Sequence, residues 1–236
     1  MILRGIDFGP ILAASGGQGF FGEGYWYDKC NRMIPGYQID GVTFVAKTTT
    51  VDLTKGHMPL NEDFTPKGFL PRCIIVDMCK GIVLNSVGLS GPGVQALLDT
   101  GGWQARTDNF FLSFMAIGKT RIHRAAEMAR FTEILGSRLD EFGGKFGIQV
   151  NFSCGNVGMG DKEPLTIEEI YENLNVLGQL DVPLMPKLCI TTSPAMARDI
   201  AKHKFCDGIC VSNALPWGQL PEKIPWQKLF GSMESP

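Results

Sequence analysis

Amide, hydroxyl and thiol side chains gather in one short segment of the sequence, at the point where an apolar run ends. The segment is Gln149-Val-Asn-Phe-Ser-Cys-Gly-Asn156, in which Asn151, Ser153 and Cys154 emerge from an expected strand. A side-chain amide presents a donor and an acceptor side by side, which suits a ligand with amide or imide edges. Read alone, the segment also fits a structural turn in which Cys154 is a small buried residue.

The same amide chemistry recurs at two other strand ends. Asn85 closes the run Ile82-Val-Leu-Asn85, and Asn213 follows Ile209-Cys-Val-Ser. In α/β folds, polar groups at the carboxyl ends of parallel strands lie where such folds place their sites. Together with Asn151 and Asn156, these side chains predict a pocket for one small, planar, polar ligand.

Two lysines also lie within or directly after apolar runs. Lys47 follows Val42-Thr-Phe-Val-Ala, and Lys187 lies within Leu184-Met-Pro-Lys-Leu188. Because lysine is rarely buried without a partner, an anionic or electron-rich ligand is the expected partner of each. The alternative is that both side chains extend to solvent. The combined pattern predicts a neutral-to-cationic, amide-lined pocket that contains a thiol.

A glycine motif offers a different hypothesis, that of an NAD-dependent oxidoreductase with a Rossmann fold. Gly17-Gln-Gly-Phe-Phe-Gly22 matches the dinucleotide-binding pattern G-x-G-x-x-G directly after an expected strand. The residues that follow, Gly24-Tyr-Trp-Tyr-Asp-Lys-Cys30, make a poor start for a helix. The next strand ends at Lys47-Thr-Thr-Thr50 without an acidic residue to bind a ribose, so the motif is a weak alternative.

Short apolar runs alternate with amphipathic stretches in the elements that must position these residues. Strands are expected at Pro10–Ser15, Val42–Thr50, Ile82–Val87, Phe110–Ile117, Gly147–Phe152, Val182–Leu188 and Gly208–Val211. Helices are expected at Arg121–Phe142, Thr166–Leu180 and Ser193–His203. The alternation over residues 110–215 predicts a parallel sheet with right-handed crossovers, which fits a barrel or an open doubly wound sheet. We find no internal repeat, so residues 1–236 are expected to form one domain.

Composition excludes several classes of function. The 44% hydrophobic residues and the formal charge of −2 indicate a globular protein without a nucleic-acid or acidic-membrane partner. His57, His123 and His203 share no ligand spacing, and the seven cysteines form no C-x-x-C pair, so no metal site is predicted. Without a signal peptide or an apolar run of about 18 residues, a cytoplasmic protein with reduced thiols is expected.

Six motifs in order along the chain resemble the dihydroorotate dehydrogenase family, in its soluble, cysteine-containing form. The motifs are Ala13-Ala-Ser-Gly16, Ala46-Lys-Thr-Thr-Thr50, Leu84-Asn-Ser-Val-Gly-Leu89 with Pro92-Gly93, Asn151-Phe-Ser-Cys-Gly-Asn156, Pro186-Lys-Leu188 and Val211-Ser-Asn213. The resemblance implies a TIM (β/α)8 barrel that holds FMN over its carboxyl mouth. It implies the oxidation of dihydroorotate to orotate in pyrimidine biosynthesis.

The resemblance also implies a role for each candidate residue. Cys154 would remove a proton from carbon 5 of dihydroorotate while hydride passes from carbon 6 to flavin N5, and Lys47 would contact both flavin and substrate. The pyrimidine would be bound by Asn85, Asn151, Asn156 and Asn213. The flavin would be contacted by Ala14, Ser15, Gly16, Lys47 and Lys187.

Departures from the family pattern keep the exact pyrimidine open. Gly155 stands where the family has proline, Ala214 stands where a hydroxyl residue is usual, and Gly56-His-Met-Pro59 replaces Gly-Asn-Pro. The electron acceptor is also open among fumarate, NAD and others, although the lack of a membrane-binding extension favours a soluble acceptor over a quinone. A homodimer is a further expectation.

The strand count predicts an incomplete barrel. Six barrel strands can be assigned before the segment that runs from Trp217 to Pro236, whereas the closed barrel has eight. We therefore expect a chain that lacks the C-terminal part of its barrel. An alternative function follows from this expectation, namely an inactive or partial chain that cannot bind FMN alone.

Overall fold

Short strands and helices alternate along the part of the chain that the computed structural model describes, which comprises residues 1–31, 33–36, 41–69, 71–77, 79, 81–152 and 163–215. The strands are β1 (Ile2–Leu3), β2 (Ile6–Asp7), β3 (Ile11–Leu12), β4 (Val42–Thr43), β5 (Ile74–Asp77), β6 (Ile82–Asn85), β7 (Phe110–Phe114), β8 (Phe146–Asn151), β9 (Leu184–Cys189) and β10 (Cys210–Asn213). The helices are α1 (Trp26–Asn31), α2 (Val94–Asp99), α3 (Arg121–Gly136), α4 (Ile167–Leu177) and α5 (Pro194–Ala201), with the 3-10 helices η1 (Leu139–Glu141) and η3 (Gly178–Leu180). Of the helices in these residues, none has the length and apolar character needed to span a membrane.

Six parallel strands form an open arc. Four of them make one sheet in the order β10-β9-β8-β7, and β3 pairs in parallel with β4. The two groups are joined by parallel bridges from Val45 to Phe111 and from Thr49 to Phe114. Over the described residues the arc does not close, and its order β3-β4-β7-β8-β9-β10 is that of an incomplete TIM barrel, as predicted.

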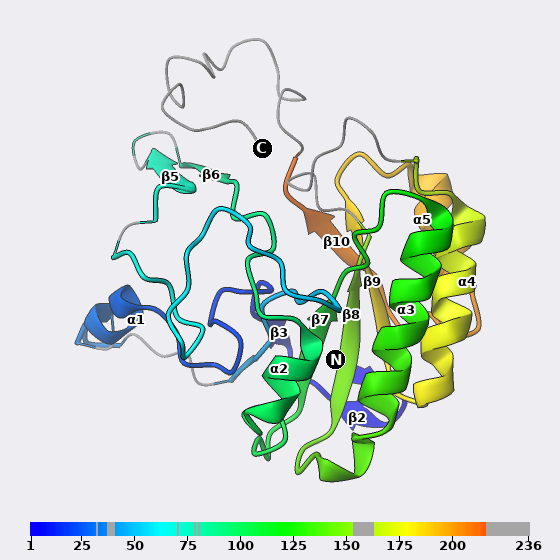
Figure 1. The fold of residues 1–236 in the computed structure, drawn as a ribbon, viewed down its shortest axis with the longest axis horizontal. Helices are drawn as coiled ribbons and strands as arrows, with labels where there is room; N and C mark the ends of the chain where they lie inside the picture. The colour runs from blue at the N-terminus through cyan, green and yellow to red at the C-terminus, as the bar shows by residue number, and fades with distance from the viewer. Residues whose placement is uncertain are drawn as a thin grey trace.

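Helices α3, α4 and α5 cover one face of the sheet and lie side by side in Figure 1. Successive side chains of a strand point to opposite faces, so alternate residues of β7 and β8 face these helices. Phe114 stacks on Phe131 of α3 with ring centroids 3.8 Å apart. Ile148 and Val150 of β8 are buried in the same apolar cluster. This layer is the main hydrophobic core.

A second, smaller apolar cluster fills the opposite face near the amino ends of the strands. It consists of Leu3, Phe8, Val45, Phe111 and Met185. The β1–β2 hairpin carries Leu3 and lies at the lower end of the sheet in Figure 1. The hairpin is attached to the rest of the fold by ion pairs from Arg4 to Asp207, at 2.8 Å, and to Asp181, at 3.0 Å. The inner face of the arc is therefore closed and apolar at this end.

The structure corrects the expected boundaries of several elements. The strand expected at Val42–Thr50 is regular only at Val42–Thr43, and the helix expected at Arg121–Phe142 ends at Gly136 and is followed by η1. The helix expected at Thr166–Leu180 likewise ends at Leu177 before η3, and that at Ser193–His203 ends at Ala201.

Two segments have a different context from the one that their sequence patterns suggested. The run that begins at Ile82 forms β6, which pairs antiparallel with β5 in a hairpin that stands apart from the arc in Figure 1. The glycine motif Gly17–Gly22 lies in turns, and the next helix, α1, begins only at Trp26 and has six residues. A dinucleotide fingerprint requires its glycine loop to open a helix, so the geometry does not favour the Rossmann alternative.

The N-termini of the helices follow the sequence signals, with one difference. Ser193 caps α5 ahead of Pro194, and the Thr166 hydroxyl accepts a hydrogen bond from the Glu169 backbone N–H at 3.3 Å, which caps α4. In a capping box the glutamate would reach back to the cap. Here the Glu169 carboxylate instead forms two bonds with Arg124 of α3, at 2.6 and 2.7 Å.

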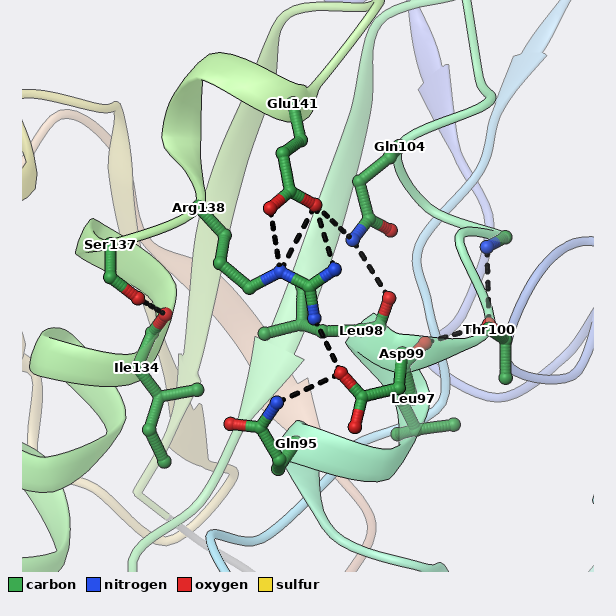
Figure 2. Close-up of polar contacts among 11 residues, drawn as sticks. Gln95, Leu97, Leu98, Asp99, Thr100, Gln104, Ile134, Ser137, Arg138 and Glu141 are labelled. Atoms are coloured by element: carbon green, nitrogen blue, oxygen red, sulfur yellow. Dashed lines mark hydrogen bonds and ion pairs between the residues drawn. The ribbon is translucent and has the colours of Figure 1, made fainter.

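A second charged network ties α2 to the end of α3. Figure 2 shows Arg138 between the carboxylates of Glu141 and Asp99, with N···O distances of 2.7 Å to each. The buried Gln104 joins this network because its side-chain nitrogen donates to the Leu98 carbonyl at 2.8 Å and to Glu141 at 3.2 Å. The network fixes the connection between α2 and β7.

We predict that Glu169→Met will lower the free energy of unfolding by about 3–5 kcal/mol, because it leaves the buried Arg124 guanidinium without its carboxylate partner. Urea denaturation measures this change. The matched control is Glu172→Met, which removes the exposed pair between Arg121 and Glu172 on the same two helices and should cost much less, because solvent screens this pair. Equal losses in the two variants would show that the buried pair has no special weight.

Candidate active site

Two buried lysines mark the inner face of the arc toward the carboxyl ends of its strands. Lys47 and Lys187 are only 8% and 9% exposed. The Lys47 ammonium donates a hydrogen bond to the Ser90 carbonyl and lies 4.7 Å from the centroid of the Phe20 ring. Lys187 lies on β9 directly beside Asn151 on one side and Cys210 on the other. Two cations are thus enclosed on one concave face.

A pair of asparagines lies next to Lys187. Asn213 of β10 donates a hydrogen bond from Nδ2 to the Oδ1 of Asn151 at 3.3 Å. Asn151 ends β8, Asn213 ends β10, and β9 lies between them. Three adjacent strands therefore bring together three of the residues that the sequence predicted for one site, namely Asn151, Lys187 and Asn213.

The turn after β3 brings Ala14, Ser15 and Gly16 against Lys47. Gly16 has a φ of +82°, which favours glycine, and its Cα lies close to the Lys47 side chain, since a Cβ atom at this position would be in van der Waals contact with the Lys47 Cγ at 3.4 Å. The Tyr25 hydroxyl donates to the Gly16 carbonyl at 2.7 Å. Burial raises the pKa of Tyr25 well above its usual value, which keeps this hydroxyl protonated as a donor. The backbone turn is therefore fixed in place from outside.

A chain of three hydroxyl groups runs from this turn to the centre of the arc. Ser15 Oγ donates to the Ala46 carbonyl at 2.9 Å and lies 3.0 Å from Thr48 Oγ1, which lies 2.8 Å from Ser113 Oγ. Ser15 has one proton, which goes to the carbonyl. Thr48 must therefore donate to Ser15, and Ser113 must donate to Thr48. The sequence analysis assigned no role to Thr48 or Ser113.

The remaining predicted residues have different outcomes. Asn85 ends β6, and its Oδ1 accepts a hydrogen bond from the Val87 backbone N–H at 2.9 Å, which closes a local turn. The segment after this turn reaches Lys47 through the Ser90 carbonyl. Cys154 and Asn156 lie outside the residues that the structure describes.

Two cysteines that sequence reasoning did not place in the site lie near the two lysines. Burial raises the pKa of Cys73, and the charge on Lys47 acts in the opposite direction. Burial likewise raises the pKa of Cys210, and Lys187 opposes this effect. The raised pKa favours the protonated form of both thiols near neutral pH.

The fold and the site define a protein of the α/β-barrel class, with polar side chains gathered at the carboxyl ends of its parallel strands. No protein-family model matches the chain. The chain is 35% identical over 153 residues to the catalytic subunit of dihydroorotate dehydrogenase B (NAD(+)) from Desulforudis audaxviator (strain MP104C). The match covers 64% of this chain but only 39% of that protein. It supports the dihydroorotate dehydrogenase family for this chain, which is the family that the six motifs predict.

We predict that Thr48→Val will destabilise the fold by about 1–3 kcal/mol, because the buried Ser113 hydroxyl loses its acceptor. The measurement is the urea midpoint at constant m-value. Thr191→Val, which makes the same change at an exposed position, should alter stability by less than about 0.5 kcal/mol. A Thr48 variant as stable as wild type would show that the hydroxyl chain does not hold β3, β4 and β7 together.

Proposed function

We propose that this chain carries the pyrimidine-binding and flavin-contacting residues of an FMN-dependent dihydroorotate dehydrogenase. The observation that carries the proposal is the hydrogen-bonded pair of Asn151 and Asn213 beside the buried Lys187, at the carboxyl ends of three adjacent parallel strands. Amides and a cation at this position suit a ring that bears imide edges and a carboxylate. The relative's name, dihydroorotate dehydrogenase B, points to the same substrate.

The described residues fit a flavin. Lys47 and Lys187 provide two buried cations for an electron-rich ring, and the Ala14–Gly16 turn offers a backbone that can approach closely because Gly16 has no side chain. When bound, FMN would supply the hydride acceptor. Lys187 would then stabilise negative charge that develops on the reduced ring.

The protein's part in the reaction would be to hold the substrate and accept a proton. Asn151 and Asn213, with Asn85 and Asn156, would orient the dihydropyrimidine so that its carbon 6 hydride leaves toward the cofactor. Cys154, three residues after Asn151, would take the carbon 5 proton on its thiolate, and the carbon 5–carbon 6 double bond of orotate forms. Lys47 would contact the carboxylate and the flavin, and its positive charge favours the substrate anion.

NAD is the first electron acceptor to test, because the relative's name includes NAD(+). Fumarate is the second. The residues named above are proposed to contact the substrate and the flavin, so they do not distinguish between these two acceptors.

We predict that the 236-residue chain, reconstituted with FMN, will be yellow and that dihydroorotate will bleach its flavin absorbance under anaerobic conditions. A colourless protein would favour the alternative of an inactive or partial chain that cannot bind FMN alone. A melting temperature raised by NAD and unaffected by FMN would instead favour the Rossmann alternative.

A further prediction of the proposed function concerns Cys154 as the general base. Cys154→Ala should slow flavin reduction by dihydroorotate by about 100-fold or more in stopped-flow experiments, with FMN still bound, because a general base contributes about 10²–10⁴-fold. Cys79→Ala, which removes an exposed thiol, is the control and should leave the rate unchanged. Unchanged reduction by the Cys154 variant would remove this residue from the base role.

A further inference from the structure

Gln149 is a buried polar residue to which neither the motifs nor the proposed mechanism gives a role. Its side chain is 3% exposed, and within the described part of the chain its Oε1 atom has no hydrogen-bond partner. A buried carbonyl oxygen that loses its water without gaining a donor costs free energy. Such an atom in a native fold calls for an explanation, and a ligand that completes its hydrogen bonding is one.

The position of Gln149 in the sheet connects it to the site. Its neighbours Ile148 and Val150 belong to the core beneath the helices, so Gln149 points to the inner face of the arc, as Asn151 does two residues later. Across the sheet it is aligned with Ser113 on β7 and with Met185 on β9. Met185 belongs to the apolar cluster that closes the amino end of the arc. Gln149 therefore lies in a polar layer between this apolar cluster, which forms the floor of the inner face, and the paired residues Asn151 and Lys187 above it.

The hydroxyl chain leaves the Gln149 oxygen without a donor from its neighbour on β7. Ser113 uses its only proton to reach Thr48, as the direction of the chain requires. The Ser113 hydroxyl can accept a hydrogen bond from the Gln149 amide nitrogen, but it cannot donate one to Oε1. The donor for Oε1 must come from elsewhere.

Gln104 shows what a structural glutamine looks like in the same protein. Its Oε1 is also buried without a partner in the described residues, but its nitrogen forms two hydrogen bonds, to the Leu98 carbonyl and to Glu141, as Figure 2 shows. These bonds join α2 to η1 and account for the burial of the residue. Among the described residues Gln149 has no comparable side-chain hydrogen bond to account for its burial, which points to a ligand.

We propose that Gln149 is a further cofactor-binding residue, whose carbonyl oxygen accepts a hydrogen bond from an N–H or O–H donor of FMN at the floor of the site. The inference rests on the proposed function, because it takes FMN as the occupant. Flavin suits the position chemically, since its imide N–H and ribityl hydroxyls are donors that can meet a buried acceptor. Gln149 is thereby a binding group, with no part in proton transfer.

The test compares Gln149→Met with Gln104→Met in the full 236-residue chain. Methionine is similar in length to glutamine but removes the amide. For Gln149→Met we expect the apo protein to melt at the wild-type temperature or above, because an unsatisfied buried oxygen is removed. Its Kd for FMN, measured by quenching of flavin fluorescence, should rise about tenfold through the loss of one hydrogen bond. For Gln104→Met we expect the reverse, a lower melting temperature and an unchanged Kd.

Each other outcome contradicts the inference. A Gln149→Met protein that fails to fold or melts well below wild type would make Gln149 a structural residue. An unchanged Kd for FMN in that variant, with tight binding by wild type, would overturn the inference alone and leave the proposed function standing. If wild type itself does not bind FMN, the proposed function fails and the inference fails with it.

Discussion

The register of the four parallel strands β7 to β10 is the constraint on which the rest of the structure depends. In this register Ser113, Gln149, Asn151 and Lys187 point to one face, while Leu112, Ile148, Val150 and Leu188 point to the helices. A shift by one residue in any strand would exchange the two faces of that strand. Because the apolar residues are tied to α3, α4 and α5, the same packing that makes the core also fixes the polar side chains on the inner face.

The polar layer lies directly above an apolar floor, and this raises the cost of any unpaired polar group within it. Most of these polar groups form hydrogen bonds with nearby protein atoms, as Lys47 does with the Ser90 carbonyl and Thr48 does with Ser15 and Ser113. The Tyr25 hydroxyl similarly holds the Gly16 carbonyl. The inner face is thus largely organised before any ligand binds, which reduces the ordering that binding must impose.

Local signals predicted much of this fold, whereas contacts between distant residues were beyond them. The caps at Thr166 and Ser193 and the apolar runs of β7, β8 and β9 depend on neighbouring residues, so the sequence revealed them. The pairing of Arg124 with Glu169 joins residues 45 positions apart and diverts a carboxylate that looked like part of a capping box. Ser113 and Gln149 were missed because a single polar residue within an apolar run carries no functional signal by itself. Gln149 lies two residues before Asn151 and so shares its face of the sheet, and Ser113 lies beside Gln149 only through the pairing of β7 with β8. Asn85 was correctly placed at a strand end, but its hairpin partner β5 was not predicted, although Ile74-Ile-Val76 is an apolar, β-branched run.

The order of the strands also sets where a ligand that meets both lysines would lie. Lys47 follows β4 and Lys187 lies on β9, and β7 and β8 stand between them. Ser113 on β7 and Gln149 on β8 face the inner side of these two intervening strands. A ligand that contacts both lysines would therefore lie over this polar layer, in which the Ser113 hydroxyl is already paired with Thr48.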